Sequence, residues 1–279
     1  MTTQQRGFSL IEMIMVMVIT AILGAGVAVF IRGPTQGYFD LARRAGITDT
    51  ADTSIRRIGR DLRQALPNSI RSVTATPQCM EYLPTSTGGR YRADVDTSGS
   101  GKMLNFSAPT TTFDLFGTLN PVPTSGDQFV VYNLGIPGAD AYSGVNRATI
   151  SSATSSSITL ATPTQFPLAS PGSRFQIVPA AQQAVFYVCT NSGSGVDTSG
   201  NGNGSLYRLS QYGFNATAPT SCPAVPSGTP VLAQNVSDCN FTYTPGVTQG
   251  NSLVSMRIAI TKNHETVSLY DEVHVSNTP

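Results

Sequence analysis

The chain has 279 residues, enough for one or two ordinary domains, and its formal net charge of +1 gives no overall field that favours nucleic acid. Charged residues make up only 12% of the sequence, where roughly 25% is usual in soluble domains. Glycine, serine, threonine, proline and asparagine fill the difference, a mixture that favours turns and short strands and is common in exported β-rich proteins.

The first predicted element is the apolar run Phe8–Ile31, which is interrupted by one charge, Glu12. The run exceeds the roughly 20 residues that cross a bilayer. An ordinary signal peptide has a shorter apolar core followed by a small-x-small cleavage site, but the best candidate site here, Gly26-Val27-Ala28, lies inside the run. A plain signal anchor fits the length but leaves Glu12 unexplained, because a carboxylate in a membrane helix is costly.

The segment Gly7-Phe8-Ser9-Leu10-Ile11-Glu12 resembles the processing site of type IV prepilins and related pseudopilins, G-F-[ST]-L-[IVL]-E. The resemblance implies that a prepilin peptidase cuts between Gly7 and Phe8 and methylates the new amino group of Phe8. It also implies that Glu12 of one subunit neutralises the Phe8 amine of a neighbour in an apolar filament core. A buried charge is tolerable there only if it has a partner.

An amphipathic helix is expected next, over residues 34–67, with Pro67 ending it. Its apolar positions recur every three or four residues: Phe39, Ala42, Ala45, Thr48, Ala51, Ile55, Ile58, Leu62 and Ala65. If Gly33-Pro34 only kinks the rod, one helical spine runs from Phe8 to Leu66. Six arginines take the other faces: Arg43, Arg44, Arg56, Arg57, Arg60 and Arg63. We interpret them as a solvated face with acidic partners rather than a DNA site, because no aromatic residue is interleaved.

The rest of the chain, residues 68–279, is predicted to form a β-rich head, which makes the fold class α+β. Short apolar or alternating runs predict strands at Cys79–Leu83, Arg90–Val95, Gln128–Leu134, Ser157–Leu160, Arg174–Val178, Ala184–Cys189, Ser205–Leu209 and Asn240–Tyr243. The clearest element is a C-terminal hairpin of Leu253–Thr261 and Glu265–Val275, in which His274 faces away from Val273 and Val275.

Four cysteines, an even number in a chain that resembles exported proteins, predict two disulfides rather than reduced core thiols. Spacing alone leaves three pairings open. We favour Cys222–Cys239, because it closes a short loop, and therefore Cys79–Cys189.

The head sequence offers no catalytic motif, and no catalytic residue, cofactor or metal is predicted. Two loops, one containing Asp94 and Asp96 and the other Asp197 and Asn201, match the start of a calcium loop. Both lack the closing glutamate, and polar hairpin tips have the same composition for conformational reasons. These four residues remain calcium candidates.

Further segments resemble the MshO-like minor pilins of mannose-sensitive-haemagglutinin type IV pili: Phe39-x-Leu41-Ala42-Arg43-Arg44, Ala51-Asp52, Arg57, Arg60–Ser69, Gly88–Arg92 and Val273-His274-Val275-x-Asn277. Major pilins commonly have a proline where this chain has Val29, which also favours a minor subunit. The resemblance implies a non-catalytic subunit that primes pilus assembly or lies near the tip.

On this interpretation residues 1–7 are a leader, 8–33 a membrane and filament-core helix, 34–67 the amphipathic helix and 68–279 the head. The implied partners are other major and minor pilins, the prepilin peptidase, the inner-membrane assembly platform and the membrane, with no nucleic acid. The protein would be a single-pass bacterial inner-membrane protein with a periplasmic head before assembly and part of a pilus or pseudopilus afterwards. The alternatives are a minor pseudopilin of a type II secretion system and a signal-anchored periplasmic enzyme or binding module.

Overall fold

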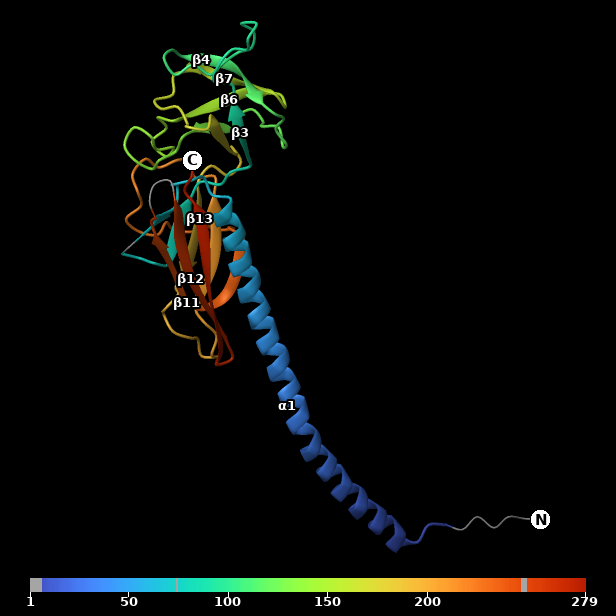
Figure 1. Ribbon diagram of the computed structural model, residues 1–279. Helices are drawn as coiled ribbons and strands as arrows, with labels where there is room; N and C mark the ends of the chain where they lie inside the picture. The colour runs from blue at the N-terminus through green and yellow to red at the C-terminus, as the bar shows by residue number, and fades with distance from the viewer. Residues whose placement is uncertain (1–6, 74, 247–249) are drawn as a thin grey trace, which may run out of the picture. The chain divides into compact units, whose positions relative to one another are not determined.

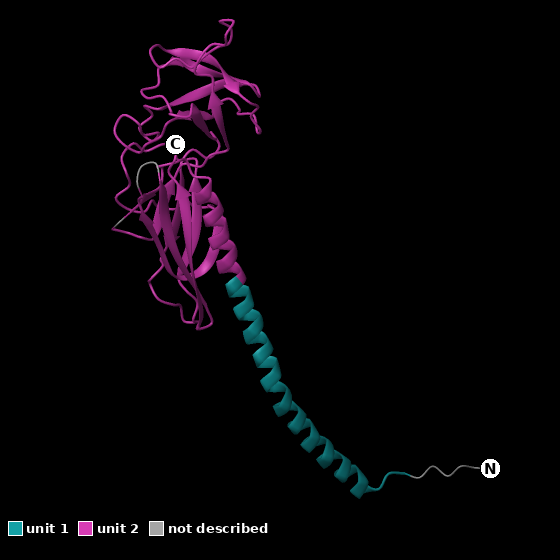
Figure 2. Ribbon diagram, viewed as in Figure 1, with its two compact units in different colours: residues 1–48 teal, residues 49–279 magenta. Residues whose placement is uncertain are grey.

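The computed structural model describes residues 7–73, 75–246 and 250–279 (Figure 1). The chain divides into two compact units, residues 1–48 and 49–279 (Figure 2). A long apolar helix is followed by a strand-rich globular region, so the predicted α+β class is confirmed. The predicted leader, residues 1–7, lies outside the described residues except for Gly7.

The only helix among the described residues is α1, Leu10–Arg63. It continues through Gly33 and Pro34, although Pro34 has no N–H to donate to the preceding turn. It ends sooner than Pro67 suggested. The N–H of Leu66 donates to the carbonyl oxygen of Leu83 at 2.7 Å, and Ala65 forms a β-bridge with Pro84. These contacts draw the chain toward the sheet before the proline is reached.

The part of α1 that belongs to the second unit, residues 49–63, is amphipathic as predicted. Ala51, Ile55, Ile58 and Leu62, spaced four, three and four residues apart, are all buried. Each large side chain contributes about 1.5–3 kcal/mol when it is removed from water. The opposite face exposes the arginines, and Arg56 pairs with Asp52 one turn earlier at 2.7 Å, the kind of partner expected for a solvated face.

An antiparallel seven-stranded sheet forms one part of the second unit, in the order β1-β2-β9-β10-β11-β12-β13. Its strands are β1 (Arg71–Ser72), β2 (Cys79–Tyr82), β9 (Val185–Thr190), β10 (Gly204–Ser210), β11 (Val231–Thr244), β12 (Asn251–Lys262) and β13 (Glu265–Ser276). The predicted C-terminal hairpin is confirmed. Asn263 and His264 both have positive φ, as a two-residue hairpin turn requires, and Val273 and Val275 are buried while His274 is exposed.

A closed six-stranded barrel forms the other part of this unit, in the order β3-β4-β7-β6-β5-β8. Its strands are β3 (Thr87–Tyr91), β4 (Thr110–Phe116), β5 (Gln128–Val131), β6 (Arg147–Ala153), β7 (Ser157–Thr164) and β8 (Arg174–Val178). Its interior is filled by aliphatic and aromatic side chains, with Phe129 4.9 Å from Phe113 and 4.7 Å from Phe175 between ring centroids. The barrel therefore has a packed core of its own.

The barrel is an insertion between two neighbouring strands of the sheet. Strands β2 and β9 are separated in the chain by residues 83–184, yet they pair directly, with Cys79 opposite Val188 and Tyr82 opposite Val185. The sequence predicted a single β-rich head and did not reveal this insertion. It also missed β1, β4 and β6, while Arg174–Val178 matches β8.

The two disulfides join Cys79 to Cys222 and Cys189 to Cys239, so the predicted pairing is wrong. Cys79 lies opposite Val188, and neighbouring residues of a strand point to opposite faces, so Cys189 lies on the other face from Cys79. Gly204, the first residue of β10, pairs with Val236 of β11. The rest of β11 extends past the end of β10, and Cys239 in that part is bonded to Cys189 on β9.

Candidate functional site

The N-terminal segment that precedes α1 contains the residues predicted to be processed, Gly7 and Phe8. Ser9 caps the helix, because its Oγ accepts a hydrogen bond from the N–H of Glu12 at 3.3 Å. Glu12 thus lies in the first turn, where the helix dipole favours a negative charge. A Cβ on Gly7 would meet nothing within 4 Å among the described residues, so their packing does not require a glycine there.

The first unit exposes a nearly continuous apolar surface along α1. Phe8, Leu10 and Phe30 are 78%, 80% and 79% exposed, and large apolar residues along the helix as far as Leu41 are exposed as well. The best 18-residue window has a mean hydropathy of 2.7, and the helix is long and apolar enough to cross a membrane. A surface of this kind is unfavourable in water and marks a segment that a bilayer or other protein chains cover.

In the second unit, Asp61 fastens the end of α1 to the sheet. Its Oδ2 accepts hydrogen bonds from Tyr82 Oη at 2.8 Å, Tyr187 Oη at 2.7 Å and Arg208 Nε at 2.9 Å. Burial alone would raise the pKa of Asp61, but the hydrogen bonds from Tyr187, Tyr82 and Arg208 outweigh it, so its pKa lies below the ordinary value. The carboxylate is therefore held in its charged form as a structural tie.

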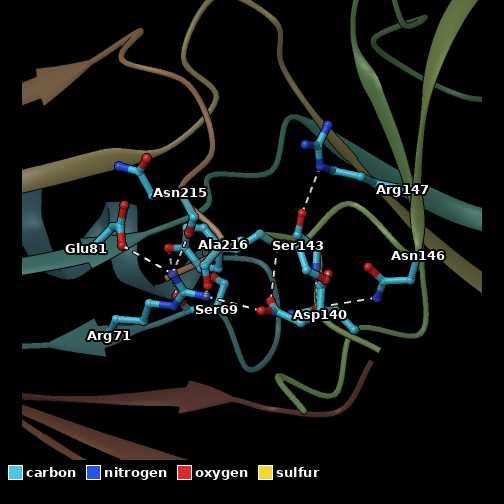
Figure 3. A network of polar contacts seen from close by, with 12 residues as sticks. Ser69, Arg71, Glu81, Asp140, Ser143, Asn146, Arg147, Asn215 and Ala216 are labelled. Carbon is cyan, nitrogen blue, oxygen red and sulfur yellow. Dashed lines mark hydrogen bonds and ion pairs between the residues drawn. The ribbon is translucent and has the colours of Figure 1, made fainter. Parts of the chain in front are cut away.

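Arg71 joins the sheet to the barrel (Figure 3). Its guanidinium lies 3.2 Å from Asp140 Oδ2 in the loop after β5, and it stacks 3.4 Å from the centroid of the Tyr142 ring. It also donates to the backbone carbonyl of Asn215 at 2.8 Å, in the segment after β10. One side chain on β1 thus connects three segments that are far apart in the sequence.

Glu81 is buried beside this arginine, and its contacts compensate only part of the cost of burying a carboxylate. Its Oε1 accepts a hydrogen bond from Tyr212 Oη at 2.9 Å, while Oε2 lies 3.8 Å from Arg71 and accepts none from the described residues. Burial raises the pKa of Glu81 above its ordinary value, because Tyr212 and Arg71 offset only part of the desolvation. Sequence reasoning missed this carboxylate because it lies on a strand that reads as ordinary core.

Asn68, in the segment after α1, joins the segment after β13 to the segment after barrel strand β5. The Asn68 side-chain amide donates to the carbonyl oxygen of Asn133 at 2.9 Å and to that of Asn277 at 3.1 Å. In return, the side-chain amide of Asn133 donates to the carbonyl oxygen of Pro67 at 2.6 Å. These hydrogen bonds explain structurally why polar residues occur just after the helix and at Asn277.

The two loops that hold the four calcium candidates form polar turns. Asp96 Oδ1 accepts hydrogen bonds from the backbone N–H of Ser98 and Ser100, and Asp197 Oδ1 accepts them from Ser199 and Asn201. Asp94 joins no metal-ligand cluster, since no group of three or more histidine, cysteine, aspartate or glutamate residues that could hold a metal occurs among the described residues. Asp96 and Asp197 thus stabilise their own turns, as short polar side chains commonly do.

The structure does not gather the remaining polar residues that it describes into a recognisable catalytic arrangement. His264 lies in the β12–β13 turn, and His274 lies on the exposed face of β13. The half-buried Asp61, Arg208 and Arg71 and the buried Glu81 are committed to contacts between elements of the fold. The functional signal of the described chain therefore lies in the N-terminal segment and the apolar helix.

Comparison with known proteins gives a family match in that same segment. The family described as the prokaryotic N-terminal methylation motif matches residues 2–28, a range that contains Gly7, Phe8 and Glu12. No curated protein matches the chain, and no solved structure does. The predicted resemblance to prepilins is confirmed at this level, and the chain carries a type IV prepilin-like N-terminus on an apolar helix.

Proposed function

We propose that the protein is a minor type IV pilin of the MshO type, a subunit that primes pilus assembly or lies at or near the pilus tip. The observation that carries the proposal is the methylation motif at residues 2–28, directly joined to a helix whose apolar surface is exposed. Prepilin-like proteins are generally structural subunits without catalysis, and we propose the same here.

The chemistry of maturation follows from the motif. Hydrolysis of the Gly7–Phe8 peptide bond by a prepilin peptidase releases residues 1–7 and leaves a cationic amine on Phe8, which is then N-methylated. Because the cut precedes α1, residues 8–33 stay attached as the membrane and filament-core helix. No described residue packs closely enough on Gly7 to require a glycine there, which supports a role for this residue in recognition by another protein.

Assembly then requires a partner for two charges in an apolar environment. In the proposed filament the Glu12 carboxylate of one subunit neutralises the Phe8 amine of its neighbour. Neither charge is tolerable alone in such a core, so only an arrangement that pairs them is stable. The apolar surface of the helix, which has no cover from the described residues of the first unit, would pack against other major and minor pilins.

Before assembly, the same helix would anchor the protein in the bacterial inner membrane with residues 68–279 in the periplasm. Two disulfides in this region support an oxidising compartment. The assembly platform and the peptidase would meet the chain from the membrane and its cytoplasmic side. Residues 34–67 would link the membrane helix to the head.

A minor pseudopilin of a type II secretion system would use the same N-terminal chemistry, and the matched motif is common to both. Labelling with antibody against the head, together with mass spectrometry of sheared surface filaments, tests the proposal. Recovery of the protein from sheared pili and label on filaments support a minor pilin. Its absence from pili, together with loss of protein secretion when the gene is deleted, would favour the pseudopilin instead.

A further inference from the structure

A groove of about 520 Å³ runs between the C-terminal part of α1 and the edge strand β13, both within the second unit. Arg56, Arg60 and Arg63 line it from the helix, and Leu269, Tyr270 and Asp271 line it from the strand. Figure 1 shows α1 and β13 side by side, and each runs toward the end of the sheet that faces the barrel. The groove thus combines a row of arginines with the edge of a sheet.

Gly59 sets the distance between the helix and the strand. A Cβ at this position would lie 3.3 Å from Val273 Cγ2 and 3.7 Å from Asp271 Oδ2, so only a glycine allows this approach without a shift. Val273 is buried under the helix, whereas Tyr270 is 62% exposed. The helix therefore covers the inward face of β13 and leaves its outer side accessible.

The edge of β13 is long and regular. Among the strands that the structure describes, β13 pairs only with β12, and the register runs without a break from Lys262–Glu265 to Asn251–Ser276. Every second residue of an edge strand points its N–H and C=O away from its neighbour. β13 has no proline, no bulge and no lysine, but three acidic residues lie along it, Glu265, Asp271 and Glu272. Its edge is therefore open to a strand that places neutral side chains opposite these acids.

The arginines lie in a row along the helix. Arg60 and Arg63 are separated by about 4.5 Å along the helix axis, whereas alternate residues of a strand repeat at roughly 6.6–6.8 Å, so the two long side chains must spread apart to meet alternate carboxylates. Arg56 already pairs with Asp52. Arg60 and Arg63 are exposed and form no ion pair within the described part of the chain, so they are available to carboxylates that enter the groove.

We propose that this groove binds an extended segment of a partner protein, which pairs with β13 as an added strand and carries acidic residues at alternate positions facing Arg60 and Arg63. Main-chain hydrogen bonds would supply affinity, and the alternate carboxylates would supply specificity. Asp271 requires a neutral side chain opposite it. This surface goes beyond the proposed pilin role, and a binding experiment on it needs no filament, so its failure would leave that role untouched.

Nucleic acid fits the groove less well. Two carboxylates, Asp52 and Asp271, lie among the three arginines and would repel a phosphate backbone. Tyr270 is the only aromatic residue among the described residues that line it, so successive bases would have no stacking platform. A strand with acidic residues only at alternate positions can avoid Asp271, whereas a continuous row of phosphates cannot.

The test uses the full chain in detergent micelles and a fluorescent peptide of alternating glutamate and valine or threonine. Two further probes are the same peptide with alternate amides N-methylated, which keeps its charge but cannot pair as a strand, and a single-stranded DNA oligonucleotide. We expect the first peptide to bind and the N-methylated one not to bind. Arg60→Glu with Arg63→Glu should weaken binding about tenfold or more, because two attractions become repulsions.

Arg57→Glu is the matched control, since Arg57 is exposed on the same helix and is not a groove residue. It should change the affinity less than about twofold. The double variant Arg60→Gln, Arg63→Gln repeats the test without introducing new charges. Absence of peptide binding, equal binding of the N-methylated peptide, an equal effect of Arg57→Glu, or tighter binding of DNA through the same arginines would each overturn the proposal.

Discussion

Tyr187 on β9 donates a hydrogen bond to Asp61 on α1 across 2.7 Å, and the same carboxylate oxygen also accepts from Tyr82 and Arg208. One acid on the helix therefore holds three strands of the sheet, β2, β9 and β10. Residues 49–63 of α1 pack on the sheet, and Asp61 lies near the end of this segment. Its contacts therefore fix the orientation of the end of α1 against the sheet.

Asp61→Asn should lower the free energy of unfolding of the second unit by about 2–4 kcal/mol, because it leaves the half-buried Arg208 without its counter-charge. Chemical denaturation of the full chain in detergent, followed by far-UV circular dichroism, measures this. Tryptophan fluorescence cannot be used to follow unfolding, because the chain contains no tryptophan. Asp52→Asn, which breaks an exposed pair on the same helix, should cost only about 0.5 kcal/mol. Equal losses in the two variants would contradict this role of Asp61.

The pH dependence of stability should carry opposite contributions from two carboxyl groups. The pKa of Asp61 is lowered in the fold, so its contribution is present above the ordinary pKa and is lost as the pH falls through the lowered value. The pKa of Glu81 is raised, so its contribution is present below the ordinary pKa and is lost as the pH rises through the raised value.

Glu81→Gln isolates the second contribution. The stability of the unmodified protein minus that of the variant should fall as the pH is raised from about 4 to about 8, because the buried carboxyl loses its proton only in the unmodified protein. Denaturation curves across this range, with Glu272→Gln on the exposed face of β13 as control, provide the comparison. A difference that rises with pH would show that Arg71 compensates the charge fully.

Peptide mapping without reduction should find Cys79 linked to Cys222 and Cys189 linked to Cys239. The two bridges join residues 143 and 50 positions apart, so chain entropy alone gives each about 4–5 kcal/mol of stabilisation. Reduction, or alanine at Cys79 and Cys222 together, should therefore lower the urea midpoint sharply. A peptide linking Cys222 to Cys239 would contradict the arrangement of the sheet.

Glu12→Val should prevent incorporation into filaments while leaving membrane insertion intact, since it removes the proposed partner of the Phe8 amine and makes the helix more apolar. Membrane fractionation and recovery from sheared filaments measure the two steps separately. Thr20→Val changes another exposed polar residue of the same helix and should leave incorporation unaffected. Normal recovery of the Glu12 variant would contradict the pairing.

Sequence patterns predicted the elements whose signal is local. The spacing of Ile55, Ile58 and Leu62 is enough to predict the buried stripe of α1, and the alternation around His274 predicts which face of β13 is exposed. The methylation motif at residues 2–28 is likewise local, because it depends on consecutive residues. The amino-acid sequence alone is therefore enough to predict Gly7 and Phe8 as the proposed cleavage site and Glu12 as the proposed assembly residue.

Long-range pairing could not be predicted in the same way. Nothing in residues 83–184 indicates that they interrupt a hairpin, because the strands on either side recognise each other only in the folded sheet. The barrel strand β6 is rich in serine and alanine and buries little beyond Ala148 and Ile150, so its pattern is faint. The cysteine pairing failed for a related reason, since loop length says nothing about which face of a strand a side chain occupies.

The polar contacts of the second unit depend on the same topology. Asp61 is one of several acids on an arginine-rich helix, and only the sheet order brings Tyr82, Tyr187 and Arg208 to it. Arg71 and Asp140 are equally inconspicuous in the sequence and meet because the barrel returns to the sheet. A signal that could have singled out Asp61 is its position beside Ile58 and Leu62 on the buried stripe, where an acid is costly without partners.

The most direct test of the account is the mass of the N-terminal peptide of protein isolated from membranes or filaments, in the unmodified chain and in Gly7→Ala. Gly24→Ala is the control, because that glycine also has open space where a Cβ would lie. We expect the unmodified chain and the control to begin at N-methylated Phe8 and Gly7→Ala to keep residues 1–7. A membrane or filament protein that still carries residues 1–7 in the unmodified chain would contradict this expectation.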